Sequence, residues 1–222
     1  MNTCILYELS DKGVSESILH ETNNMSFLEC SIETLRKCNF EHIYINTPCK
    51  YSMQVAKESG LKILEFKPRT LSELMLSVAE HIMSKHFLFI NPTFPFVSKN
   101  TINKYLKEIG LNSFDSGFSA TSSKELPMWK KEEPLNFSIE DRDSFTTEDI
   151  FIENEAFYLR TRDSILSGRN IYSGSIKPLK IPFEESINCT SNKIYNQSIN
   201  NKSEKRNHTE SYQILNNKTT WL

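Results

Sequence analysis

The chain has 222 residues and a formal net charge of −2, a length that suits a single α/β domain with a buried core. The nearly balanced charge argues against a surface built for nucleic acid or an anionic membrane, and no apolar run approaches the roughly 20 residues of a membrane span. The start lacks the basic-then-apolar layout of a secretory signal. The five cysteines are odd in number and form no CxxC pair, which indicates reduced thiols rather than disulfides or a zinc site. We therefore expect a cytoplasmic protein that binds neither nucleic acid nor membrane.

Apolar runs alternate with amphipathic stretches along the first 110 residues. Ser26 is a suitable N-cap for the first helix, and Gly60 and Gly110 follow two others as expected of helix ends. Strand–helix alternation with short connections is typical of a parallel sheet with right-handed crossovers. The predicted strands are 3–9, 42–46, 61–66 and 87–90, and the predicted helices are 26–38, 51–59, 72–85 and 101–109.

The second half continues this pattern less regularly. A strand is predicted at 114–120, a short helix at 162–166, and an edge strand at 176–183, whose prolines suit an unpaired edge. Residues beyond Ser191 are rich in Asn, Ser and Lys, which predicts a mobile tail. The expected organisation is one domain over residues 1–191 followed by a tail over 192–222.

Residues 151–159 read Phe-Ile-Glu-Asn-Glu-Ala-Phe-Tyr-Leu. Glu-Asn-Glu is unfavourable in the middle of a buried strand. The pattern fits a chain that enters a sheet with side chains facing a cleft, and it fits a polar turn before an ordinary core strand. The segment resembles Glu-Asn-Gly-Ala-Phe-Tyr-Ile of the cytidylyltransferases that make CMP-sialic acid and related CMP-sugar acids, where it lines the sugar site.

Two further segments follow the order of that family. After the buried strand at 87–90, Asn91-Pro92-Thr93-Phe94-Pro95 resembles the family's Gln-Pro-Thr-Ser-Pro. This turn lies at the carboxyl end of a strand, where open α/β sheets bind ligands. Near the end of the domain, Glu185-Ser186-Ile187-Asn188-Cys189-Thr190 resembles Glu-Ser-Ile-Asp-Ile-Asp, whose aspartates hold Mg²⁺ in the family. Asn188 and Thr190 supply oxygen but no charge in those two places.

The nucleotide side of the resemblance is weaker. Residues 10–14 (Ser-Asp-Lys-Gly-Val) follow the first strand, where backbone N–H groups and a lysine can meet phosphate. The family's loop, Ala-Arg-Gly-Gly-Ser-Lys-Gly-Ile-Pro, holds the triphosphate of CTP. The Lys-Gly-Ile of that loop aligns with Lys12-Gly13-Val14. Its arginine has no counterpart, because Leu9 falls near that place, and its two glycines are replaced by Ser10 and Asp11. Lys67-Pro68-Arg69 resembles an Arg-Pro segment that helps bind the nucleotide, with lysine in the arginine's place.

The resemblance implies a three-layer α/β domain with a mostly parallel sheet, of the nucleotide-diphospho-sugar transferase type. Residues 122–150 correspond to an excursion that packs on a second subunit in the family, so it also implies a homodimer. Lys12 would be the catalytic group, neutralising phosphate, and Mg²⁺ would accompany CTP in an active enzyme. The implied nucleotide-binding residues are Ser10, Lys12, Gly13, Lys67, Arg69 and Asn91. The implied sugar-binding residues are Thr93, Arg142, Glu153, Asn154 and Phe157.

Two functions remain open from the sequence. In the first, the chain transfers the cytidylyl group of CTP to a nine-carbon sugar acid. In the second, the sugar side survives while catalysis is weak or lost, which leaves a sugar-binding, nucleotide-binding or partner subunit. The changes at the loop arginine, the loop glycines and both metal aspartates favour the second, because all fall on the triphosphate side. A glycosyltransferase of the same architecture ranks last, because we find no Asp-x-Asp metal motif of the kind expected there.

Overall fold

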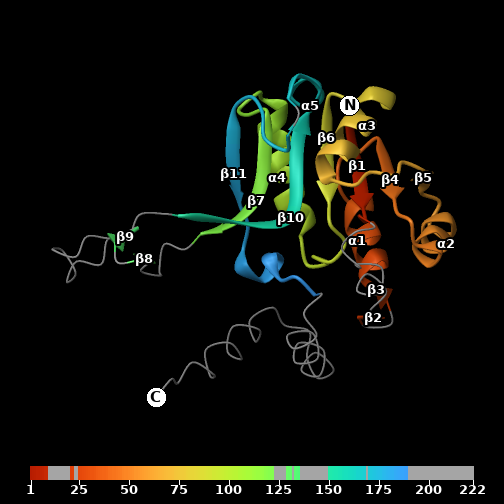
Figure 1. The fold of residues 1–222 in the computed structure, drawn as a ribbon. Coiled ribbons are helices and arrows are strands. Elements are labelled where there is room, and N and C mark those ends of the chain that lie inside the picture. The colour runs from red at the N-terminus through yellow and green to blue at the C-terminus, as the bar shows by residue number, and fades with distance from the viewer. Residues whose placement is uncertain are drawn as a thin grey trace, which may run out of the picture. The chain divides into compact units, whose positions relative to one another are not determined.

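The computed structural model describes residues 1–9, 21–22, 25–122, 129–131, 133–135, 150–168 and 170–189 (Figure 1). The chain divides into two compact units, Met1–Asn188 and Cys189–Leu222. The tail predicted over 192–222 lies outside the described residues.

One seven-stranded sheet forms the centre of this unit, in the order β11-β7-β10-β6-β1-β4-β5. Neighbouring strands are parallel, except that β10 runs antiparallel to both β6 and β7. The mostly parallel sheet is therefore confirmed, and β11 lies at an edge as its prolines predict. The strands are β1 (Asn2–Tyr7), β4 (His42–Asn46), β5 (Lys62–Leu64), β6 (His86–Ile90), β7 (Ser116–Ser122), β10 (Phe151–Thr161) and β11 (Ile176–Lys180).

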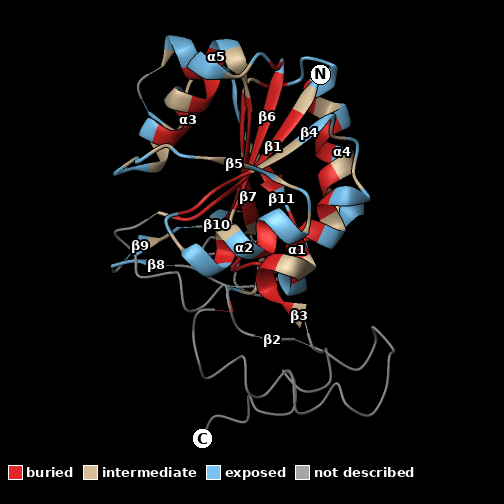
Figure 2. Ribbon diagram, turned by 90° about the vertical axis from the view of Figure 1, so that its right-hand side faces the viewer, coloured by how far each residue is buried: buried red, intermediate tan, exposed pale blue. Residues whose placement is uncertain are grey.

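Helices cover both faces of the sheet, which gives three layers. One apolar core joins α1, α2 and α4 to the sheet, and a second joins α3 and α5 to it. Figure 2 shows the buried strands between α3 and α5 at the left and α4 at the right. The helices are α1 (Phe27–Arg36), α2 (Lys50–Glu58), α3 (Leu71–His81), α4 (Lys99–Gly110) and α5 (Arg162–Ser167), with a 3₁₀ turn η3 (Phe183–Ser186) after β11.

Side-chain caps begin several of the helices, and the predicted N-cap at Ser26 is confirmed. The Ser26 hydroxyl accepts a hydrogen bond from the backbone N–H of Glu29, and the Glu29 carboxylate accepts one from the backbone N–H of Ser26 at 2.7 Å, which is a capping box. Thr70 and Ser98 cap α3 and α4 in the same way through their hydroxyls. Gly60 has φ +67° after α2, a conformation that glycine adopts without steric cost.

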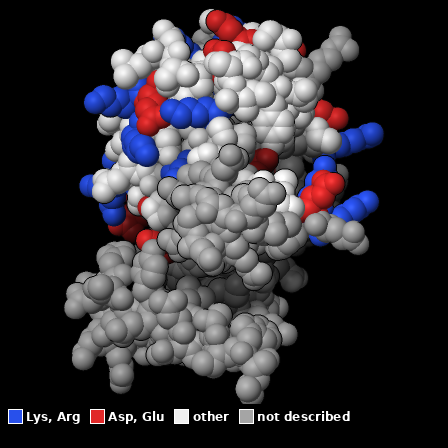
Figure 3. Space-filling model, turned by 90° about the vertical axis from the view of Figure 1, so that its left-hand side faces the viewer, with Lys and Arg blue, Asp and Glu red and all other residues white. Residues whose placement is uncertain are grey.

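Two short hairpins lie outside the main sheet, β2 (Glu21–Thr22) with β3 (Met25–Ser26) and β8 (Trp129–Lys130) with β9 (Glu133–Pro134). None of the helices in the described part of the chain is long and apolar enough to cross a membrane. Seen from the β11 side, basic and acidic side chains are interspersed over the surface that Figure 3 colours, in keeping with the small net charge.

Candidate functional site at the carboxyl edge of the sheet

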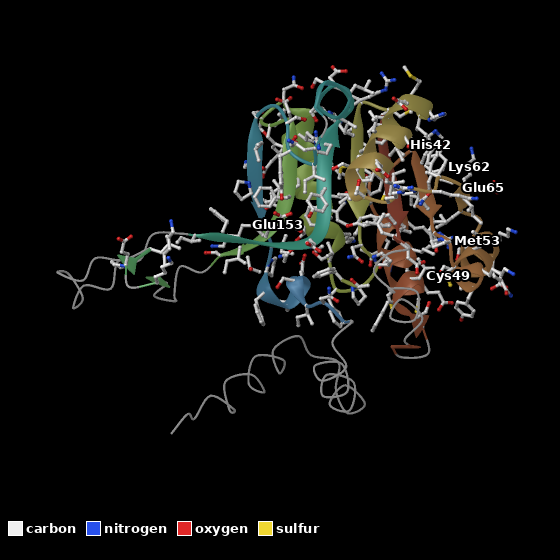
Figure 4. The ribbon with its side chains drawn as sticks, in the orientation of Figure 1. His42, Cys49, Met53, Lys62, Glu65 and Glu153 are labelled. Atoms are coloured by element: carbon white, nitrogen blue, oxygen red, sulfur yellow. The ribbon has the colours of Figure 1, made fainter. Side chains whose placement is uncertain are left out.

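The strand order creates a switch point between β1 and β6. From β1 the chain crosses to β4 and β5 on one side, then returns to place β6 on the other side of β1. Open α/β sheets bind ligands in the crevice outside the carboxyl ends of the strands at such a point. In Figure 4 the carboxyl ends of the parallel strands point downwards. Glu153 lies towards that edge of the sheet, well apart from Cys49, Met53 and Glu65 on the β4–β5 side.

The strand β10 changes direction as it reaches this edge. Between the pairs Glu153–Ala120 and Tyr158–Phe118, β10 advances five positions while β7 advances two, which marks an enlarged bulge. Glu155 lies inside it with φ +59°, and in Figure 1 the first half of β10 runs away from the sheet beside the end of β7. The predicted polar turn is therefore a bend within one continuous strand. Glu155 also stands where the resembled motif has glycine, the residue that suits a positive φ.

Two tyrosine hydroxyls hold the Glu153 carboxylate. Tyr158 donates to Oε1 at 2.5 Å, and Tyr172, from the segment between α5 and β11, donates to Oε2. Burial and the bond to Glu153 raise the pKa of both phenols, and burial followed by the charges of Glu155 and Glu153 raises the pKa of Tyr7. The phenols therefore remain protonated donors. A carboxylate has about four acceptor positions, so Glu153 keeps some for a ligand.

Asn154 is the next residue of β10, and half of its side-chain amide has no hydrogen-bond partner among the described residues. Its Oδ1 accepts from the Ser119 hydroxyl at 2.6 Å and from the backbone N–H of Ala156 at 3.2 Å. Its Nδ2 is buried and has no hydrogen-bond partner among the described residues. An unsatisfied buried donor costs about 1–3 kcal/mol, and the acceptor oxygen of a ligand would satisfy it.

The turn after β6 is fixed by its own side chains. The Oδ1 atom of Asn91 accepts from the backbone N–H of Thr93 at 3.1 Å and from its hydroxyl at 2.8 Å. The backbone N–H of Asn91 donates to the carbonyl of Ala156 at 3.0 Å, which ties the turn to β10. The Asn91 amide NH₂ remains available to a ligand. Thr93 is buried and orients Asn91.

The structure does not bring Phe157 to the crevice. Its side chain is fully buried and packs against Tyr105 with ring centroids 6.4 Å apart. Phe157 therefore contributes to the core beneath the site.

Glu8 is a site residue that the sequence analysis missed. It follows β1, its backbone N–H donates to the carbonyl of Asn46 at 2.9 Å, and its carboxylate accepts from the Thr47 hydroxyl. Burial raises the pKa of Glu8, and the bond from Thr47 partly offsets this effect. The sequence places Glu8 near the end of the predicted strand 3–9, and nothing in the pattern indicates that its carboxylate is buried beside β4.

The other predicted nucleotide residues lie apart from Glu153 or outside the description. Lys67 and Arg69 are exposed in the segment after β5, and β4, β1 and β6 separate β5 from β10. Arg69 donates its backbone N–H to the Glu73 carboxylate at 2.7 Å. Ser10, Lys12, Gly13, Arg142 and Thr190 lie outside the described residues.

The residues at the family's metal positions do not fit Mg²⁺, because Asn188 and Thr190 offer neutral oxygens to a cation that prefers carboxylates. Glu185 lies close in sequence, but its carboxylate accepts the backbone N–H of Ser98 at 3.1 Å, at the start of α4. Within the described ranges, no group of three or more His, Cys, Asp or Glu side chains is arranged to hold a metal. The triplet 141–143, Asp-Arg-Asp, does have the Asp-x-Asp spacing, which corrects the expectation that the sequence contains none, but it lies outside the described residues.

Comparison with known proteins finds related folds but no close relative. No protein-family model and no curated protein matches the chain. The 4-diphosphocytidyl-2C-methyl-D-erythritol synthase of Anaerococcus prevotii has a TM-score of 0.63 and 14% identity, over 92% of this chain and 99% of its own. The CMP:2-keto-3-deoxy-manno-octonic acid synthetase complexed with CTP has a TM-score of 0.56 and 10% identity, over 90% and 86%.

The bifunctional IspDF of Campylobacter jejuni has a TM-score of 0.61 and 12% identity over 83% of this chain, which spans 50% of that protein. At such identities the likeness concerns the fold. The chain thus has the α/β fold of the nucleotide-diphospho-sugar transferase type.

Proposed function

We propose that this chain binds CTP and a nine-carbon sugar acid at the carboxyl edge of β1 and β6, where the first half of β10 lies, and that cytidylyl transfer there is weak or lost. The observation that carries the proposal is the Glu153 carboxylate, which is held by two tyrosine hydroxyls and is followed in the chain by Asn154 with its unused amide nitrogen. Similar folds in proteins named for a cytidylyl product and for a complex with CTP support it.

The sugar side offers complementary groups for hydroxyls. Glu153 accepts hydrogen bonds from ligand hydroxyls through the positions that the tyrosines leave free, while Asn154 and Asn91 donate amide N–H groups to ligand oxygens. A ligand carboxylate beside Glu153 would meet like charge. The hydroxyl-bearing part of the sugar acid therefore faces Glu153, and its carboxylate points away, with Arg142 as the partner that the resemblance suggests.

In the proposed reaction, a sugar hydroxyl attacks the α-phosphorus of CTP. A new P–O bond forms, the bond to the bridging oxygen of pyrophosphate breaks, and the hydroxyl loses its proton. Such transfer depends on positioning and on neutralising the charge that develops on the phosphate oxygens. Lys12 supplies positive charge, with Lys67 or Arg69 in support.

The second candidate is a silent binding or partner subunit, and Glu8 favours it. This buried carboxylate lies at the end of β1, directly before the segment expected to hold the triphosphate, and like charge opposes phosphate binding. Loss of one charge-stabilising group often costs about 10²–10³ in rate. With the loop arginine and both metal carboxylates also replaced, the combined effect is enough to silence the reaction.

The test is calorimetric titration with CTP, with and without Mg²⁺, alongside pyrophosphate release in the presence of a sialic-type acid. Binding of CTP and of the acid with slow or no turnover is expected. Rapid Mg²⁺-dependent turnover would overturn the weakened-site proposal, and a folded protein that binds neither molecule would overturn the function itself.

Two variants sharpen the test. Glu8→Gln removes the opposing charge and should tighten CTP binding by roughly fivefold to tenfold, the size of one screened charge interaction of about 1 kcal/mol. Glu153→Gln should weaken binding of the sugar acid and leave CTP binding unchanged. If Glu8→Gln leaves CTP affinity unchanged, Glu8 does not face the phosphates.

A further inference from the structure

Arg160 is an arginine buried in the second half of β10, away from Glu153. It is fully buried, and burial lowers its pKa to about 10, while the charge of Asp115 acts in the opposite direction. Its hydrogen bonds in the described structure go to neutral acceptors, which are serine hydroxyls, backbone carbonyls and the sulfur of Met75 at 3.9 Å. Taking a guanidinium out of water is costly unless its donors are satisfied, so the arrangement of these acceptors is the reason it is tolerated.

The acceptors come from one end of α5 and from the segment that follows it. Nε donates to the Ser164 hydroxyl at 3.1 Å, and one terminal nitrogen donates to the Ser164 carbonyl at 3.0 Å. That same nitrogen donates to the Ser173 hydroxyl at 2.5 Å, and the other terminal nitrogen donates to the carbonyls of Asn170 at 3.3 Å and Ile171 at 2.5 Å. The planar fork of arginine suits several acceptors in fixed directions. Arg160 thus gathers residues 170–173 against α5.

Other contacts place the same segment with little freedom. A Cβ atom added to Gly168 would lie 2.5 Å from the Cβ of Ser173, so the end of α5 and the segment approach too closely for a side chain. The backbone N–H of Ser173 donates to the Ser116 hydroxyl at 3.2 Å, which joins the segment to β7. Tyr172 leaves this segment to reach Glu153.

We propose that Arg160 is a positioning residue for Glu153: by fixing residues 170–173, it holds the Tyr172 hydroxyl on the Glu153 carboxylate. The contact between the rings of Tyr172 and Phe118, with centroids 5.6 Å apart, places the ring laterally, and Arg160 sets the backbone from which the ring extends. The importance of Glu153 for a ligand rests on the proposed function. The coupling between Arg160 and Tyr172 does not, because it exists in the free protein.

A double-mutant cycle on the unfolding equilibrium of the free protein tests the coupling. Tyr172→Phe removes the donor to Glu153 that comes from residues 170–173. Tyr158→Phe removes the other donor, which belongs to β10 itself and does not depend on that segment. In an Arg160→Met background, the effect of Tyr172→Phe on the unfolding constant should shrink by about fivefold. The effect of Tyr158→Phe should stay the same, which makes it the matched control.

Equal effects of Tyr172→Phe in both backgrounds would overturn the proposal, and so would an equal loss for both tyrosines, which would mean general loosening of the sheet. If Arg160→Met does not fold, the cycle is run with Arg160→Lys, which keeps the charge but not the fork, and with Ser173→Ala. A ¹³C label on the tyrosine rings gives a second measurement. At neutral pH the Tyr172 resonance, assigned by Tyr172→Phe, should change its chemical shift in the Arg160 variant, and the Tyr158 resonance should change much less.

Failure of this cycle and failure of the proposed function are distinguishable. If the cycle shows no coupling between Arg160 and Tyr172 while the protein still binds CTP and the sugar acid, only the proposed role of Arg160 is ruled out. A positive cycle in a protein that binds neither ligand leaves Arg160 as the positioner of a carboxylate with another use.

Discussion

At the scale of single residues, the buried ionisable groups determine how the protein responds to pH. His86 is buried at the start of β6, where its Nδ1 lies 2.9 Å from Oδ1 of Asn2 and its Nε2 has no partner among the described residues. Burial, with the charges of Lys85 and the N-terminal amine, lowers the pKa of His86 to about 4, and Glu41 acts in the opposite direction. The folded protein is therefore more stable with the His86 imidazole neutral than with it protonated.

Acidification should destabilise the protein through His86. Because the folded pKa lies below the unfolded value of about 6.5, the stabilisation is complete above pH 6.5 and is lost as the pH falls towards 4. The free energy of unfolding, measured in urea at pH 7.5 and pH 5, should fall less in His86→Gln than in the original chain. The same replacement at exposed His81 is the control, and an equal fall in all three proteins would contradict the assignment.

The site could be anticipated from the sequence only where polar residues interrupt an apolar pattern. Glu153 and Asn154 stand out in this way, and both lie at the carboxyl edge. Tyr172 and Glu8 carry no such signal, because a tyrosine in a loop and a glutamate after a strand are ordinary at the surface. Their contacts join residues 19 and 39 positions apart in the chain, and no local pattern encodes those distances.

At the scale of elements, caps and apolar spacing are enough to predict the helices. The capping box at Ser26 and the hydroxyl caps at Thr70 and Ser98 begin three of them. At β10 the sequence leaves two interpretations open, entry into a sheet and a polar turn before a strand, and the structure shows one strand with a bend. The bend there follows from pairing with β7 and β6, so tertiary contacts override local preference.

Replacing Glu155 should reveal the strain of the bend. A side chain at positive φ costs roughly 1–2 kcal/mol, which glycine avoids. Glu155→Ala removes the side-chain interactions but keeps the backbone strain. The unfolding free energy of the Glu155→Gly variant should therefore be larger than that of the Glu155→Ala variant by about 1 kcal/mol. Equal stability of the two variants would show that position 155 relaxes out of the left-handed region.

The contact between β7 and β11 should tolerate no added methyl group. A Cβ atom on Gly117 would lie 2.6 Å from Cδ1 of Leu179 and 2.8 Å from the Phe114 ring, whereas one on Gly110 would meet open space. Gly117→Ala should therefore lower the unfolding free energy by about 1–3 kcal/mol, the usual cost of overpacking. Gly110→Ala is the matched control and should not destabilise the protein. A harmless Gly117→Ala would mean that β11 can shift.

At the scale of the whole molecule, the first half of β10 carries apolar side chains away from the core. Phe151 and Ile152 are 39% and 46% exposed, on the segment that runs outward beside the end of β7 in Figure 1. Adjacent exposed apolar residues on an extended segment favour burial against another surface. They agree with the homodimer that the resemblance implies for residues 122–150.

Light scattering coupled to size-exclusion chromatography tests the dimer. The chain should elute as a dimer, and Phe151→Ser with Ile152→Ser should shift it to a monomer without unfolding it. Leu111→Ser changes a residue that is 72% exposed beyond the end of α4 and should leave the mass unchanged. If the unsubstituted protein elutes as a monomer, the predicted dimer is wrong.

The bulge in β10 also decides which face of the sheet receives the candidate site. In an unbroken strand, residues five apart point to opposite faces, yet Tyr158 donates to Glu153. The three residues by which β10 exceeds β7 between them reverse the alternation, so Glu153 shares the face of Tyr158 rather than that of Phe157. The odd excess is therefore what lets a glutamate five positions before Tyr158 reach its hydroxyl. A regular strand with the same sequence and no bulge would turn Glu153 to the opposite face of the sheet, while every residue of the site remained in the chain.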